Sequence, residues 1–272
     1  MHIAFLFRVI KAASTWSLIH LFRKFTTKTT YLLNLVNLYE RRDKKTLQDL
    51  KFIRALGSVN YKSTINLLDK SKSQLRQDLF VISESKYKKH GFFVEFGATD
   101  GIDMSNTFML EAEFSWTGIL AEPARVWEKQ LKLNRPNVSI ETLCVWKDSN
   151  SLLIFNETHA PALSTVDSFS DLDGHKLARA TGKKYNVHSI SLNDLLIKHG
   201  APKHIDYLSI DIEGSEYEVI KAFNFDEYII KIISIEHNYT PQRELIYSLL
   251  TSRGYKRKYE NISAFDDWYV KS

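Results

Sequence analysis

Short apolar runs alternate with stretches of helical periodicity from Gly91 to the end of the chain, and this alternation is the strongest constraint on the fold. A chain with this pattern is expected to form a mostly parallel sheet with helices on both faces, a Rossmann-like α/β fold. We expect strands at 92–97, 118–122, 138–145, 205–210 and 231–236, with a late antiparallel edge pair at 254–260 and 267–270. We expect helices at 105–114, 124–133, 191–199, 214–223 and 241–252.

Residues 1–72 are predicted to be a basic helical extension, with residues 73–272 as the main domain. Residues 1–90 contain 18 Lys and Arg against 6 Asp and Glu, whereas the remainder contains 19 against 26. A basic leader on an acidic body suggests an anionic partner for the leader alone. Nucleic acid is not expected as a substrate, because the basic residues lie outside the predicted cleft.

Residues 1–28 are predicted to form an amphipathic segment. Its longest uncharged run, 12–22, is 11 residues, which is shorter than the roughly 20 that a membrane span needs. The apolar face can either lie in a membrane interface or pack on protein, and periodicity does not separate the two. The single cysteine, Cys144, lies in an apolar run, which favours a buried strand position in a reducing compartment. We therefore expect a cytoplasmic protein, with peripheral membrane contact through residues 1–28 as an open alternative.

The expected ligand site lies where the strands end, because open α/β sheets bind ligands beyond the carboxyl ends of their strands. The first strand ends in "EFGATDG", which supplies Glu95, Gly97, Asp100 and Gly101. Gly97 lets a ligand approach the backbone, and the two acids would repel a phosphate but suit a cationic ligand such as S-adenosylmethionine.

The second and third strand ends complete the expected cofactor site. Glu122 ends the second strand and is placed to bind both ribose hydroxyls, which would serve NAD and S-adenosylmethionine equally. Val145, at the end of the third strand, is the remaining expected cofactor contact.

Catalytic candidates converge at the ends of the fourth and fifth strands. Asp211 and Glu213 lie in "DIEG", and Glu236 and His237 end the next strand. His237 can act as a general base; alternatively, Asp211 and Glu236 can hold a divalent cation through oxygen ligands. Negative charge at a helix N-terminus is a structural alternative for Asp211 and Glu213. The polar loop 156–169 can contribute His159 and Ser164 to an acceptor pocket.

Four segments together resemble one family. "GFFVEFGATDGIDMSNTFMLE", "WTGILAEP", "DYLSIDIEGSEYEVIKAF" and "ISIEHN" are similar, in order and spacing, to the FkbM family of S-adenosylmethionine-dependent methyltransferases, over about Ser73 to Val270. The resemblance implies a class I methyltransferase fold and methyl transfer to oxygen, with acceptors that are often sugar or polyketide hydroxyls.

The resemblance also implies roles for individual residues. The family's glycine-loop motif falls on Glu95, Gly97, Asp100 and Gly101, and its ribose-binding acid falls on Glu122. Two departures are visible: Thr99 stands where the family often has Asn, and "EPAR" replaces "EPNP".

We therefore expect an O-methyltransferase that uses S-adenosylmethionine on a hydroxyl of a sugar or glycan. The alternatives are a catalytically inactive methyltransferase-like scaffold and a nicotinamide-dependent oxidoreductase. The acidic loop without a second close glycine argues against the oxidoreductase.

Overall fold

The computed structural model describes residues 46–56 and 61–272. Most of the predicted basic extension, including residues 1–28 with their proposed membrane contact, lies outside these ranges. Within them, no helix combines the length and apolar character that crossing a bilayer requires.

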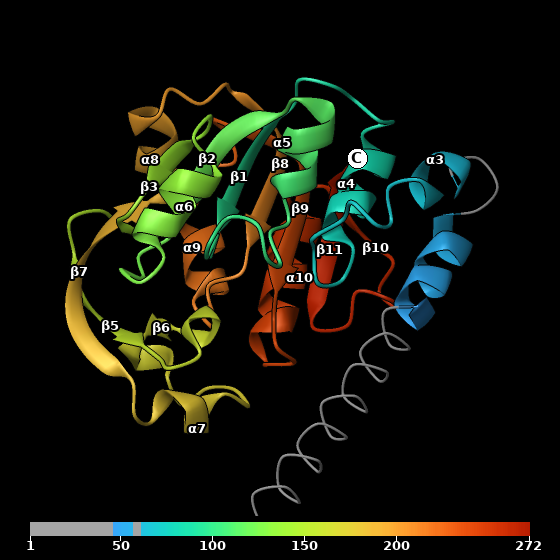
Figure 1. The fold of residues 1–272 in the computed structure, drawn as a ribbon. Coiled ribbons are helices and arrows are strands. Elements are labelled where there is room, and N and C mark those ends of the chain that lie inside the picture. Colours follow the sequence, from blue (N-terminus) through green and yellow to red (C-terminus); the bar gives the residue numbers. More distant parts are fainter. Residues whose placement is uncertain (1–45, 57–60) are drawn as a thin grey trace, which may run out of the picture. The chain divides into compact units, whose positions relative to one another are not determined.

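A seven-stranded sheet, in the order β10-β11-β9-β8-β1-β2-β3, is the centre of the fold within the described residues (Figure 1). Strands β3, β2, β1, β8 and β9 are parallel to one another, whereas β11 pairs antiparallel with β9 and with β10. This confirms the mostly parallel α/β fold with an antiparallel edge. The strand bounds are β1 Phe92–Phe96, β2 Thr117–Ala121, β3 Ser139–Glu141, β8 His204–Ile210, β9 Ile229–Glu236, β10 Tyr255–Lys258 and β11 Asp266–Lys271.

Helices cover both faces of this sheet, because successive strand side chains point to opposite faces and both sets are apolar. Val94 of β1 packs in one cluster with α8 (Leu192–Lys198), α9 (Glu216–Ala222) and α10 (Gln242–Ser252). Its neighbour Phe93 packs in the opposite cluster. The helices of that second face are α4 (Gln77–Glu84), α5 (Phe108–Phe114) and α6 (Glu128–Asn134).

The compact unit that contains the sheet begins at Lys51. Residues 51–56 are helical, and α3 (Tyr61–Ile65) follows. Phe52 is fully buried, and its ring meets that of Trp268 edge-on at 6.3 Å between centroids. The predicted domain boundary after residue 72 stays a prediction, and the described residues 51–56 and 61–72 are part of the same compact unit as the sheet.

The predicted single strand 138–145 is wrong, because the chain leaves the main sheet after Glu141. The Glu141 carboxylate accepts hydrogen bonds from the amides of Thr142 and Leu143, at 2.9 and 3.0 Å, which turns the backbone away. Cys144 then begins a strand of another sheet, where it is buried as expected.

A second, four-stranded sheet in the order β4-β7-β5-β6 was not predicted (Figure 1). Its strands are β4 Cys144–Trp146, β5 Leu152–Glu157, β6 Thr165–Val166 and β7 Lys183–Ser191. The polar loop expected at 156–169 is instead the end of β5, the 3₁₀ helix η1 (Pro161–Leu163), β6 and the 3₁₀ helix η2 (Asp167–Phe169). A short helix, α7 (Lys176–Arg179), precedes β7.

The strand order of the main sheet reverses between β1 and β8. From β1 the chain adds β2 and β3 on one side, and later β8 and β9 on the other. Gly97 follows β1 at this point with φ +75°, and a Cβ there would lie 1.8 Å from the Asp211 carbonyl oxygen. The close approach of these two strand ends therefore excludes any side chain at residue 97.

We predict that Gly97→Ala destabilises the protein by at least ~2 kcal/mol, because it adds a backbone clash to an unfavourable positive φ. Urea unfolding followed by circular dichroism measures this. Gly174→Ala is the control, since a Cβ at Gly174 meets nothing within 4 Å. Equal stability of the two variants would contradict the close approach of β1 and β8.

Candidate active site

A cavity of about 310 Å³ lies at the carboxyl ends of β1, β2, β8 and β9. Its position is the switch point where ligands bind in open α/β sheets. Eight of the candidate site residues predicted from the sequence line it: Glu95, Gly97, Glu122, Val145, Ser164, Asp211, Glu213 and Glu236.

Glu95, near the end of β1, fixes the loop that follows this strand. Glu95 is buried and accepts hydrogen bonds from the Asn106 amide at 2.6 Å and from the hydroxyls of Ser105 and Thr107. Burial raises the pKa of Glu95, although these donors and the nearby Arg135 oppose the shift.

Asp100 and Gly101 do not line the cavity. The Asp100 carboxylate accepts hydrogen bonds from the amides of Ile102 and Asp103, at 2.8 and 2.9 Å, and so closes its own turn. Gly101 has φ +82°, and a Cβ there would meet the Leu131 and Arg135 side chains at 2.7 Å. The predicted cofactor contacts of both residues stay predictions.

Glu122 is 5% exposed and borders the cavity. Its carboxylate accepts one backbone hydrogen bond on each oxygen, from Thr99 at 2.9 Å and from Ala124 at 2.8 Å. These amides fix the carboxylate, and each oxygen keeps a second lone pair for a ligand hydroxyl. Thr99 adopts φ +46°, a region that Asn tolerates better than a β-branched residue.

The "EPAR" departure does not bring a charge into the cavity. Arg125 does not line it, and its guanidinium lies 4.1 Å from the centre of the Tyr185 ring. The ring partner comes from β7, so the arginine ties the end of β2 to the second sheet.

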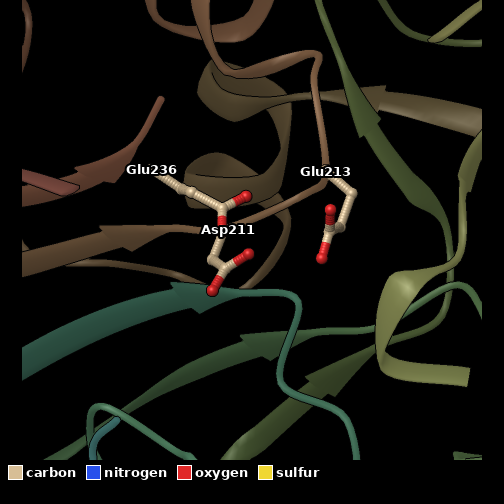
Figure 2. A group of neighbouring side chains, drawn as sticks. All are labelled: Asp211, Glu213 and Glu236. Atoms are coloured by element: carbon tan, nitrogen blue, oxygen red, sulfur yellow. The ribbon is translucent and has the colours of Figure 1, made fainter. Parts of the chain in front are cut away.

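Asp211, Glu213 and Glu236 bring one carboxylate oxygen each to within 4.8 Å of one another (Figure 2). Asp211 and Glu213 follow β8, and Glu236 ends the neighbouring strand β9. Glu213 and Glu236 are each 6% exposed, whereas Asp211 is half-buried. Burial raises the pKa of Asp211 to about 6, and burial together with Asp211 raises the pKa of Glu236.

Glu213 has φ +62°. Its Oε2 forms a buried ion pair with Nη2 of Arg179, at 2.6 Å. Arg179 is 1% exposed and also donates to the Leu163 carbonyl and to Asp173, both at 2.8 Å. It therefore joins the loop after β8 to the segment that walls the cavity. Sequence reasoning missed Arg179, because a solitary Arg in a polar stretch is normally exposed.

His237 does not line this cavity. It is 3% exposed; its Nδ1 accepts a hydrogen bond from the Tyr239 amide at 3.0 Å, and its Nε2 lies 3.8 Å from Asp267. Burial lowers the pKa of His237. The ring thus holds the turn after β9, and its predicted role as a base stays untested.

The wall opposite the strand ends comes from the second sheet and its loops. Ser164 lines the cavity, whereas His159 does not, and their predicted part in an acceptor pocket stays a prediction. The other wall residues are Pro161, Ala162, Leu163 and Val166, which lie within the predicted loop 156–169, and Phe155 and His175, which lie outside it and which sequence reasoning missed. Their positions depend on strands β5 to β7, which the sequence pattern did not reveal.

We predict that Glu122 makes the stability of the protein pH-dependent. Burial raises its pKa from 4.5 to about 7, so the folded protein holds a proton that the unfolded chain releases. The resulting stabilisation is complete below pH 4.5 and is lost as the pH rises through 7. Between pH 4.5 and 8, the free energy of unfolding of the wild type should fall by up to about 3 kcal/mol relative to that of Glu122→Gln.

Urea unfolding of both proteins across this pH range measures the difference. Glu128→Gln, on the exposed face of α6, should follow the wild type. A constant difference between wild type and Glu122→Gln at all pH values would contradict the assignment.

One family model matches this chain, and several solved structures show a distant similarity to it. The family model of the methyltransferase FkbM domain matches residues 95–257. No curated protein matches the sequence. Similar solved structures include methyltransferase FkbM from Methylobacillus flagellatus KT, 13% identical, with a TM-score of 0.48 over 84% of this chain and 59% of that one. This chain therefore spans less than two thirds of that protein's length.

Two further solved structures are more distant. A human methyltransferase 10 domain containing protein is 9% identical, with a TM-score of 0.38 over 72% of this chain and 81% of that one. A mutant of MtNAS in complex with S-adenosylmethionine is 10% identical, with a TM-score of 0.32 over 86% of this chain and 75% of that one. The match of the FkbM domain to more than half of the sequence establishes that this chain belongs to the FkbM methyltransferase family.

Proposed function

We propose that this protein transfers a methyl group from S-adenosylmethionine to a hydroxyl oxygen of a sugar or glycan. The observation that carries the proposal is Glu122, whose carboxylate is fixed at the end of β2 on the border of the cavity. An acid in this position binds the ribose hydroxyls of an adenosine cofactor. Family membership supports methyl transfer as the reaction.

The charge of the cavity favours a sulfonium cofactor over a dinucleotide. Five carboxylates line it, and among its described lining residues there is no lysine or arginine. A pyrophosphate would be repelled there, whereas a sulfonium and an α-ammonium would be attracted. With the ribose on Glu122, Gly97 and Val145 would contact the remainder of the cofactor.

The chemistry needs alignment and a destination for one proton. The acceptor oxygen attacks the methyl carbon, the sulfur–carbon bond breaks, and its electron pair remains on sulfur as S-adenosylhomocysteine forms. The hydroxyl proton leaves toward the carboxylates of Asp211 and Glu236. Holding the acceptor in line with the methyl group supplies most of the rate enhancement in such a displacement.

The wall from the second sheet is our candidate for acceptor recognition. It combines apolar groups from Phe155 and Leu163 with the hydroxyl of Ser164 and the imidazole of His175. An apolar surface beside a few polar groups suits a ring that carries hydroxyls.

We predict that the purified full chain binds S-adenosylmethionine saturably in calorimetric titration and does not bind NAD. Glu122→Ala should weaken binding of S-adenosylmethionine at least 10-fold, because the ribose loses its acceptor. Glu227→Ala, which removes only a partly exposed partner of Lys203, should bind like the wild type.

A folded wild type that binds NAD but not S-adenosylmethionine would overturn the proposal. Incubation with radiolabelled S-adenosylmethionine and a panel of glycans then identifies the acceptor. Label is expected in an alkali-stable ether, which distinguishes O-methylation from ester formation.

A further inference from the structure

We propose that Asp211, Glu213 and Glu236 form a binding site for a divalent cation at the floor of the cavity. The role of this cation rests on the proposed function. Its binding does not, and can be tested by itself. Figure 2 shows the three carboxyl groups around one space.

The three cluster acids differ from the other acids at the strand ends in the hydrogen-bond donors that they receive. Glu216 accepts from the amides of Ile212 and Gly214, at 3.0 to 3.1 Å, and Asp266 accepts from the Gln77 amide group at 2.7 Å. Their charges are therefore committed within the protein. Among the described residues, Oε2 of Glu236 has no hydrogen-bond partner, and the side-chain partner of the Asp211 carboxylate is the Glu236 carboxyl group itself.

Oε2 of Glu236 is the observation that points to a ligand. Glu236 is 6% exposed and lines the cavity, and its Oε2 is buried without a hydrogen-bond partner. A buried carboxylate oxygen without a partner carries the full cost of its lost hydration. A cation between Asp211 and Glu236 would remove that cost.

The described residues supply too little positive charge to neutralise the three carboxylates without such a cation. Arg179 is the one guanidinium in the described residues that contacts the three carboxylates, through Glu213, and it is shared with Asp173. Arg179 occupies Oε2 of Glu213, which leaves Oε1 for another ligand. Three carboxylates thus share less than one positive charge.

The geometry and donor set indicate the kind of cation. All candidate ligand atoms are carboxylate oxygens within 4.8 Å of one another, and two oxygens bound to one cation at about 2.4 Å are at most about 5 Å apart. Oxygen-only ligands select Mg²⁺, Mn²⁺ or Ca²⁺ over softer metals. A cation with three protein ligands keeps positions for an acceptor hydroxyl, whose pKa it would lower.

We predict that the full chain, stripped with EDTA, binds Mn²⁺ at one site that Mg²⁺ competes for, as measured by loss of the free Mn²⁺ electron paramagnetic resonance signal. Asp211→Asn and Glu236→Gln should each weaken Mn²⁺ binding at least 10-fold. Asp226→Asn is the control, because Asp226 is almost fully exposed beside Arg253.

Thermal melts give a second readout. Mn²⁺ should raise the melting temperature of the wild type and of Asp226→Asn, but not of the two cluster variants. A folded wild type without Mn²⁺ binding, or cluster variants that bind Mn²⁺ like the wild type, would overturn the inference.

Titration with S-adenosylmethionine separates this inference from the proposed function. Glu122→Ala should weaken binding of S-adenosylmethionine and keep Mn²⁺ binding. Binding of S-adenosylmethionine by a wild type that does not bind Mn²⁺ would refute the cation site alone.

Discussion

Burial of carboxylates at the carboxyl ends of the parallel strands is the constraint on which the rest of this structure depends. A carboxylate removed from water must be hydrogen-bonded, paired with a positive charge or protonated. The loops after β1, β2 and β8 are shaped by that requirement. Glu95 binds the residues that lead into α5, Glu122 joins two loops, and Glu216 holds the turn before its own helix.

The same requirement separates two kinds of acid within one cavity. Acids whose oxygens are occupied by backbone amides set the positions of the loops, as Glu95 and Glu122 do. Asp211 and Glu236 receive no such donors from the described residues, so their charge is available to a ligand. Glu122 belongs to the first kind but borders the cavity, where a fixed acid would also contact the proposed cofactor.

Much of the main sheet could be predicted from sequence, because its strands are buried on both faces and appear as continuous apolar runs. Gly97 lines the cavity, and its lack of a side chain is also required by the Asp211 carbonyl, a contact between distant segments that sequence does not show. The second sheet was missed because its strands are half-exposed; Leu152 and Ile154 of β5 are 60% and 49% exposed. Arg179 was missed for a related reason, since its burial depends on that sheet.

A crystal structure of the full chain with S-adenosylhomocysteine is the most direct test of the central claim that the cavity at the strand ends is the cofactor site. We expect ribose hydroxyls within hydrogen-bonding distance of the Glu122 carboxylate, with the sulfur facing the space between Asp211 and the wall from the second sheet. Ligand density outside this cavity, or a ribose held by other residues, would contradict it.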